Sequence, residues 1–328
     1  MTGASLPRWL RIQPLFVQPS PPGPPVLVGA GDIAGCPDQY KDEATKALLD
    51  GIAGTVFTAG DNAYMNGTPA EFAACYGPSW TWGQHKDRTR PAAGNHEYIS
   101  LGSGYFTYFG PVSNPPFGYY SYNLGAWHVV VINSTPQVYM CYPPELKEGT
   151  DEAEEQVPYQ DLWGDPQLDE LPNSPTAGRA CAGDAAQQAW LIADLIAHRR
   201  YKCTVTYFHH PRFSSGRHGN HYQMQRIWDI LYAFGVDVVI SGHDHVYERF
   251  APQDPEGRRN FGRGIRQFTV GTGGAPLYDW GVIQPNSEVR NNTTHGVLKL
   301  NLGNRSYAWE FVPVAGATFT DSGSGRCH

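Results

Sequence analysis

Short apolar runs that end in glycine and a polar residue recur along the chain. VLVGAGD (26–32) and TVFTAGDNAY (55–64) share this design, and the stretch 42–53 between them looks helical. A strand, a helix and a second strand, with an aspartate at each strand end, predict a βαβ unit. In an open α/β sheet the carboxyl ends of the strands line one crevice, so we expect function at that edge.

Later runs predict further strands. WHVVVIN (127–133), CTVTYF (203–208) and VDVVIS (236–241) are apolar enough to be buried strands. QFTVGTGG (267–274), GVLKLNL (296–302) and SYAWEFV (306–312) follow as strands joined by turns, which suggests that they form a second sheet.

Two helices are predicted between the later strands, which gives the α/β class. Asp184 is placed to cap the first helix, with Gln187 reaching back as in a capping box. Its apolar face would consist of Trp190, Ala193 and Ala197. The second helix is predicted from apolar residues at helical spacing, which are Met224, Ile227, Trp228 and Leu231.

The chain of 328 residues has no internal repeat and no visible boundary between two domains. QPSPPGPP (18–25) predicts a stiff linker, so residues 1–25 would be a proline-rich tail and 26–328 a single domain. The stretch 143–180 is acidic, rich in proline and without a period. It predicts a surface insertion that could form a lid over the site. Asp151, Glu152, Glu154 and Glu155 could bind calcium, but a solvated acidic loop is favoured because EF-hand spacing is absent.

Charge and composition limit the class of partner. The formal net charge is −7 and no basic block is present. This disfavours nucleic acid and anionic membranes as partners, and with them a nuclease activity. No stretch reaches the ~20 apolar residues that span a bilayer. The oligomeric state cannot be inferred from these features.

Six scattered cysteines, none in a CxxC pair, predict up to three disulfides in an exported protein. Cys36–Cys75 is the best pair, because both residues lie in loops near one predicted edge. Cys141–Cys181 would close the acidic insertion, and Cys203–Cys327 remains by subtraction. Pro7 and Pro14 interrupt the start of the chain, so it is a poor signal peptide and export would depend on a separate leader.

Five short polar stretches each follow a predicted strand. They are GDIAG (31–35), GDNAY (60–64), GNHE (94–97), FHHP (208–211) and GHDH (242–245). Each is a weak signal alone, since a lone Asp after a strand is usually a turn residue. Together they would meet at one crevice, where Asp, Asn, His and Tyr donors suit Fe, Mn or Zn. Such a set exceeds the needs of one tetrahedral zinc and fits a metal pair.

These stretches together resemble the metal-binding motifs of the calcineurin-like metallophosphoesterases, and more closely those of the purple acid phosphatases. Most of that superfamily has a D-x-H first motif, but here Ala34 occupies the histidine position. Tyr64 instead stands three residues after Asp61, as in the purple enzymes. The resemblance covers about 26–312 and implies a four-layer α/β/β/α sandwich with two mixed β-sheets.

The resemblance also implies two metal sites that share Asp61. The first, for Fe(III), would use Asp32, Asp61, Tyr64 and His245. The second, for Fe(II), Zn(II) or Mn(II), would use Asp61, Asn95, His209 and His243. His209 and His210 compete for one position, and the H-x-P ending of the family motif favours His209.

Further residues are candidates for substrate contact beside Asn95. His96 resembles a family residue that contacts the phosphate, although it could instead orient Asn95 or Asp61. His218 lies where the family places a substrate histidine and would protonate the leaving group, unless it is only a surface-loop residue. Arg217 could clamp a phosphate oxygen, and His221 could replace His218. Glu248 and Arg249 are expected to form a local ion pair.

The predicted function is therefore hydrolysis of small phosphate monoesters, with in-line attack by a metal-bound hydroxide and Asp61, His96 and His218 as catalytic residues. A phosphodiesterase or nucleotide pyrophosphatase on the same centre is one alternative. A non-catalytic metal-binding domain is the other. The protein is expected to be secreted or periplasmic.

Overall fold

The computed structural model describes residues 23–36, 39–139 and 184–328. Most of the predicted tail and the whole predicted insertion, with the pair Cys141–Cys181, lie outside the described residues. In the part of the chain that is described, none of the helices combines the length and apolarity needed to span a bilayer.

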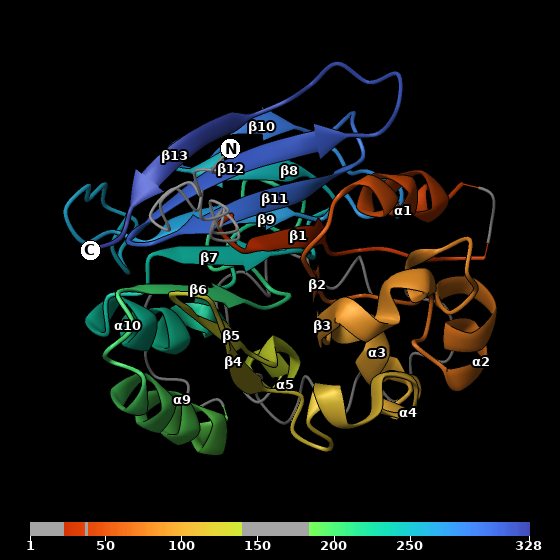
Figure 1. The fold of residues 1–328 in the computed structure, drawn as a ribbon, viewed down its shortest axis with the longest axis horizontal. Helices are drawn as coiled ribbons and strands as arrows, with labels where there is room; N and C mark the ends of the chain where they lie inside the picture. The colour runs from red at the N-terminus through yellow and green to blue at the C-terminus, as the bar shows by residue number, and fades with distance from the viewer. Residues whose placement is uncertain (1–22, 37–38, 140–183) are drawn as a thin grey trace, which may run out of the picture.

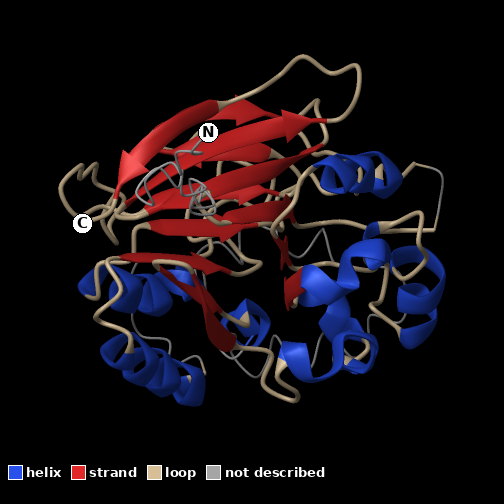
Figure 2. Cartoon of the chain, in the orientation of Figure 1, coloured by secondary structure: helices blue, strands red, loops and turns tan. Residues whose placement is uncertain are grey.

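Two mixed β-sheets pack against each other (Figures 1 and 2). The first has the order β13 (Ser322–Arg326), β12 (Ser306–Pro313), β11 (Gly296–Gly303), β1 (Val26–Ala30), β2 (Thr55–Ala59) and β3 (Thr89–Ala92). The second has the order β10 (Ser287–Asn291), β8 (Tyr247–Phe250), β9 (Arg266–Val270), β7 (Val238–Ser241), β6 (Cys203–Tyr207), β5 (Trp127–Val131) and β4 (Tyr120–Leu124).

The α-helices of the described residues are α1 (Asp42–Gly51), α2 (Pro69–Glu71), α3 (Asn95–Ile99), α4 (Ser103–Phe109), α5 (Ser134–Tyr139), α9 (Ala185–Ala197) and α10 (Gln225–Ala233). Short helices of other types span Phe72–Tyr76, Trp82–Arg88, Gly110–Ser113 and Tyr222–Met224. Helices α9 and α10 pack on the outer face of the second sheet, α1 lies beside β11 of the first sheet, and other helices gather at the end near β3 (Figure 1).

Alternating side chains explain the layers. In β5, Val129 and Val131 belong to the core between the two sheets, whereas Val130 belongs to the core between the second sheet and α9 and α10. Successive strand residues point to opposite faces, so a strand that is apolar throughout must be covered on both. The predicted four-layer α/β/β/α sandwich with two mixed sheets is confirmed.

The βαβ prediction for the first strands is confirmed, because β1 and β2 pair in parallel with α1 between them. The grouping of the late strands was wrong in part. β11 and β12 extend the sheet of β1, whereas β9 pairs with β7 in the other sheet. Strand order depends on contacts distant in sequence, so turns alone did not predict it.

The predicted details of α9 needed correction. Asp184 caps the helix by accepting from the Gln187 backbone amide. The Gln187 side chain instead bonds to the backbone N–H and C=O of Asn133, both at distances under 3 Å. The fully buried apolar residue of the helix is Leu191, with Leu195 5% exposed, rather than the predicted Ala193 and Ala197. The predicted apolar residues of α10 are all buried.

Two of the predicted disulfides are present. Cys36–Cys75 links the loop after β1 to the short helix Phe72–Tyr76, and Cys203–Cys327 ties the start of β6 to the C-terminal segment. Both pairings were predicted from the sequence and are confirmed.

Candidate metal centre

The loops that follow β1, β2 and β3 in one sheet, and β6 and β7 in the other, converge on one cluster of polar side chains. All seven predicted metal ligands lie in it, and each is at most 5% exposed. They are Asp32, Asp61, Tyr64, Asn95, His209, His243 and His245. The strand ends therefore bring together residues from five separate parts of the chain.

One group of donors surrounds the Tyr64 hydroxyl. Its oxygen lies 3.1 Å from Asp32 Oδ1, 3.2 Å from Asp61 Oδ2 and 3.1 Å from His245 Nε2. His245 Nδ1 is 2.7 Å from the Pro276 carbonyl oxygen, which can only accept. That contact assigns the ring proton to Nδ1 and leaves the Nε2 lone pair directed at the group.

A second group surrounds His209. Its Nε2 lies 2.9 Å from Asn95 Oδ1, 3.1 Å from Asp61 Oδ2 and 3.2 Å from His243 Nδ1. Its Nδ1 lies 2.8 Å from the Ala59 carbonyl oxygen, which again assigns the ring proton to Nδ1 and leaves Nε2 facing the donor group. Asp61 Oδ2 belongs to both groups, so one carboxylate oxygen connects the two sets of donors.

The donor chemistry fits two metal ions. Each group gathers oxygen and imidazole nitrogen acceptors within about 3 Å of one another, an arrangement that is repulsive without a proton or a cation. Burial favours the neutral forms, but the attraction between Asp61 and His209 is stronger: it lowers the pKa of Asp61 well below its usual range and raises the pKa of His209 to about 9. The cluster thus stabilises positive charge strongly.

Several of these residues adopt a left-handed backbone. The φ angles of Asp32, Asp61 and His243 are 59°, 48° and 71°. Non-glycine residues are uncommon in this region and concentrate at functional sites, with Asp, Asn and His the most tolerant. At Gly60 (φ 84°) an added Cβ would lie 2.5 Å from His209 Nδ1. The turn after β2 therefore requires glycine both for its conformation and for its contact with a candidate ligand.

Glu97 organises the loop of Asp61, a role that sequence reasoning missed. Its buried carboxylate accepts from the backbone amides of Asp61 at 3.0 Å, Asn62 at 2.7 Å and Gly94 at 2.7 Å. Burial and then the charge of Asp61 raise the pKa of Glu97 to about 7. The GNHE motif contained the residue, but its partners are backbone groups, which leave no signal in the sequence.

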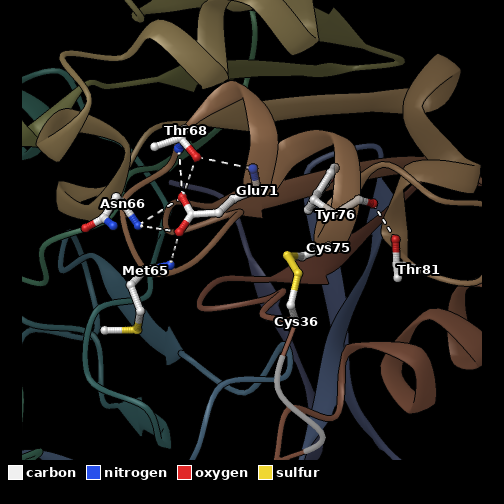
Figure 3. The surroundings of a disulfide bond; sticks show 8 residues. All are labelled: Cys36, Met65, Asn66, Thr68, Glu71, Cys75, Tyr76 and Thr81. Carbon is white, nitrogen blue, oxygen red and sulfur yellow. Dashed lines mark hydrogen bonds between the residues drawn. A yellow bond between two sulfur atoms is a disulfide. The ribbon is translucent and has the colours of Figure 1, made fainter.

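The Tyr64 loop is stabilised on its outer side, near the Cys36–Cys75 disulfide (Figure 3). Glu71 accepts from the backbone amides of Met65 and Thr68 at 2.8 and 2.9 Å, and the Thr68 side chain accepts from the Glu71 amide as a capping box. These bonds restrain the segment that follows Tyr64.

A family model of calcineurin-like phosphoesterases matches residues 26–247, which include all seven of these side chains. The chain belongs to the calcineurin-like phosphoesterase family. The family suggests a metal-dependent phosphoesterase, and it implies two metal ions.

Two proteins of Arabidopsis thaliana are similar to parts of this phosphoesterase-family chain. One is named probable inactive purple acid phosphatase 1 and is 30% identical over 125 residues, which are 36% of this chain and 20% of that protein. Purple acid phosphatase 18 is 35% identical over 97 residues, 27% of this chain and 21% of that protein. The matched segments thus span about a fifth of either relative.

Solved structures support the fold at low sequence identity. Purple acid phosphatase PPD1 from yellow lupin superposes with a TM-score of 0.61 and 17% identity, covering 92% of this chain and 53% of that one. GAP50, described as the anchor in the inner membrane complex of Plasmodium, superposes with a TM-score of 0.62 and 14% sequence identity. The superposition covers 94% of this chain and 90% of that one. The predicted resemblance to purple acid phosphatases is confirmed.

His96 lies at the edge of the donor group that surrounds the Tyr64 hydroxyl. Its backbone amide donates to Asp61 Oδ1 at 2.9 Å, and its ring packs 4.5 Å from the Tyr64 ring. Its Nδ1 lies 2.5 Å from the Met65 carbonyl oxygen, and its Nε2 lies 3.8 Å from Asp61 Oδ2. The side chain is 19% exposed, so it can reach both the centre and solvent.

The loop after β6 carries the other predicted substrate residues. The His218 ring lies 4.5 Å from the His243 ring, and burial lowers the pKa of His218. Arg217 is exposed beside Tyr278, with 5.9 Å between the guanidinium and the ring centre. His221 is 1% exposed, and its ring centre lies 4.8 Å from that of His243.

The environment of His210 differs from that of His209. His210 Nδ1 lies 2.9 Å from the Ser134 hydroxyl, and its ring packs 4.6 Å from that of His243. Burial lowers the pKa of His210 well below its usual range. His209, in contrast, makes the contacts with Asp61 and Asn95 given above, which favours His209 as the ligand.

Tyr278 is a residue of the site that the sequence did not reveal. Its ring stacks on His245 with 3.9 Å between ring centres and an angle of 11° between planes. It also lies 5.6 Å from the His218 ring. It follows the glycine turn 271–276, far from every metal motif in sequence, so no spacing indicated it.

Proposed function

We propose that this protein hydrolyses phosphate monoesters with a pair of metal ions. The observation that carries the proposal is the pair of donor groups joined by Asp61 Oδ2. Its position at the carboxyl ends of strands from both sheets is that expected of a ligand site in layered α/β folds.

In this proposal the first ion, Fe(III), is held by Asp32, Asp61, Tyr64 and His245. The second, Fe(II), Zn(II) or Mn(II), is held by Asp61, Asn95, His209 and His243. When bound, the ions would supply positive charge to the phosphate and lower the pKa of water. Hard carboxylate and phenol oxygens suit the trivalent ion, and imidazole suits the divalent ones.

The side chains around the cluster would act on the substrate. His96 and His218 approach it from different loops, His96 beside Tyr64 and His218 beside His243. We propose that both contact phosphate oxygens and that His218 donates a proton to the departing alcohol. A bound phosphate next to His218 would favour its protonated form and oppose the effect of burial. Arg217, exposed at the same rim, would contact a phosphate oxygen or the leaving group.

The disulfides Cys36–Cys75 and Cys203–Cys327 support a location outside the cytoplasm, because such bonds persist in oxidising compartments. We therefore propose a secreted or periplasmic protein that acts on small phosphate esters.

A non-catalytic role is the second candidate, and specific observations favour it. One similar Arabidopsis protein is named probable inactive, and GAP50, which has the same fold, is described as an anchor. The intact donor set favours catalysis, since an anchor needs no paired cation sites. Turnover decides between them.

The test measures turnover of 4-nitrophenyl phosphate and of bis(4-nitrophenyl) phosphate by the purified protein, together with metal content and the visible spectrum. We expect two metals per chain, faster hydrolysis of the monoester and a purple absorption band. Asp61→Asn should abolish turnover and the paired occupancy. Full activity in Asp61→Asn would overturn the bridging assignment, faster diester hydrolysis would indicate a phosphodiesterase, and no turnover with two metals bound would favour the non-catalytic role.

A further inference from the structure

Asp244 lies between two candidate metal ligands, His243 and His245, but belongs to neither donor group. Its side chain is fully buried. Gly216 packs so closely that an added Cβ would lie 2.3 Å from Asp244 Cγ. The carboxylate is therefore directed at the loop after β6, the strand next to β7 in the same sheet.

Both carboxylate oxygens of Asp244 accept hydrogen bonds from that loop. Oδ1 accepts from the His218 backbone amide at 2.9 Å, and Oδ2 accepts from the Ser214 hydroxyl. The Ser214 oxygen in turn accepts from the Gly216 amide at 3.0 Å. Charge-assisted bonds of this kind in a buried site are stronger than neutral ones and fix geometry.

Glu248, from the same segment, supports the loop at a further point. It accepts from the Ser215 backbone amide at 2.8 Å. The prediction of an ion pair between Glu248 and Arg249 was wrong, because Arg249 forms ion pairs with Glu288 and Asp321 instead. The alternation of a β-strand separates neighbouring side chains, which explains the different partners.

We propose that Asp244 is a positioning residue for His218. It couples the ligand loop His243–His245 to the loop of the proton donor, so that His218 is held at a fixed distance from the metal centre. The proposal rests on the proposed function, because it assigns to His218 the protonation of the leaving group. Misplacement of a catalytic group by about 1 Å can cost about 100-fold in rate.

The test compares Asp244→Ala and Asp244→Asn on two monoesters. The phenol of 4-nitrophenyl phosphate leaves readily without a proton, whereas the alcohol of an alkyl phosphate such as 2-glycerophosphate needs one. We expect Asp244→Ala to lower kcat about 100-fold on the alkyl ester and less than about tenfold on the aryl ester. Asp244→Asn retains an oxygen that can accept from the His218 amide and should restore most of the lost rate. Metal content should remain at two ions per chain.

Asp237→Ala is the matched control. Asp237 is also a buried carboxylate that accepts two backbone amides, from Thr204 at 2.8 Å and His328 at 2.9 Å, but it lies at the start of β7, the opposite end of that strand. It should affect both esters equally. The double variant Asp244→Ala with His218→Ala should be no slower on the alkyl ester than His218→Ala alone, since the two residues act through one group.

Equal losses on both esters, or a loss of metal, would overturn the proposal in favour of a general structural role. If the wild-type protein turns over neither ester, the proposed function fails, and amide hydrogen exchange still decides the positioning claim. Asp244→Ala should accelerate exchange at Gly216 and His218 at least tenfold while leaving Asp61 and Asn95 unchanged. Unchanged exchange at His218 would refute it.

Discussion

A single added methyl group at Gly60 should disable the metal centre. Gly60 has φ 84°, and a Cβ built there lies 2.5 Å from His209 Nδ1 and 2.7 Å from His209 Cβ. Ordinary contacts of a Cβ are 3.4 Å or longer, so Gly60→Ala requires a shift of roughly 1 Å between the turn and the imidazole. That shift breaks the bond from His209 Nδ1 to the Ala59 carbonyl, which orients the inner nitrogen.

The magnitude has two parts. An alanine at positive φ costs about 1–2 kcal/mol, and the overpacking adds about 1–3 kcal/mol, so the free energy of unfolding should fall by about 2–5 kcal/mol. Loss of the carbonyl bond behind a metal-ligating histidine should weaken metal binding by about 10–100-fold. A ligand displaced by ~1 Å should lower kcat about 100-fold.

Gly235→Ala is the control for backbone strain. Gly235 has φ 71°, and nothing lies within 4 Å of a Cβ built there. Denaturant unfolding, metal analysis and kcat on 4-nitrophenyl phosphate should show that Gly235→Ala loses only about 1–2 kcal/mol of stability and keeps its metals and its activity. If Gly60→Ala matched Gly235→Ala in metal content and kcat to within threefold, the close contact with His209 would have no functional meaning.

Two other substitutions test separate parts of the molecule. Tyr64→Phe should remove the purple band and leave slower hydrolysis, because the phenol oxygen is the proposed source of the colour; a band that persists in the visible spectrum would contradict the tyrosyl ligand. The Asp194 carboxylate accepts hydrogen bonds from His128 Nε2 at 2.7 Å and from Ser121 Oγ at 2.8 Å. Burial raises the pKa of Asp194, but the hydrogen bonds from His128 and Ser121 outweigh burial, so the net effect is a lowered pKa. Its folded pKa therefore lies below the unfolded value of about 3.9, so its stabilisation is complete above that pH and is lost as the pH falls through the folded pKa. Asp194→Asn should cost about 1.5–3 kcal/mol at pH 7, the usual range for hydrogen bonds to a charged group. The cost should become progressively smaller below about pH 4, and a difference that stays constant down to pH 2 in urea titrations would refute this.

The local pattern predicted the polar stretches, because each follows a strand, whereas the individual ligands such as Tyr64 were implied by the resemblance to the family. Asp32 and Asp61 follow apolar runs, and parallel strands end at a common edge, so their proximity followed from local pattern alone. Glu97 and Asp244 illustrate the limit. Both act on backbone amides of other loops, and a backbone donor looks the same at every position of a sequence. Tyr278 was missed for a related reason, since its stacking partner comes from a distant loop.

The errors in the fold also have physical causes. β9 and β11 are both apolar strands near the C-terminus, but β9 pairs with β7 in one sheet and β11 pairs with β1 in the other. The hydrophobic pattern within a strand does not indicate which other strand it pairs with. In α9, Gln187 is fully buried because it bonds to both backbone groups of Asn133. Because Gln187 is polar, the sequence pattern did not assign it to the buried face of the helix. The predicted face with Ala193 and Ala197 is therefore rotated about the helix axis from the observed face with Gln187, Leu191 and Leu195.

Each donor group draws from both sheets, which gives the inner core a functional role. Asp61 and Asn95 follow strands of the first sheet, while His209 and His243 follow strands of the second. The acceptors repel one another, so their close approach must be maintained by other contacts. Those contacts are apolar. The ring centres of Phe57 in β2, four residues before Asp61, and Tyr207 at the end of β6, two residues before His209, lie 5.5 Å apart in the core between the sheets. Burial between the sheets thus supplies the free energy that holds the charged cluster together, and a bound cation would in turn stabilise the contact between the sheets.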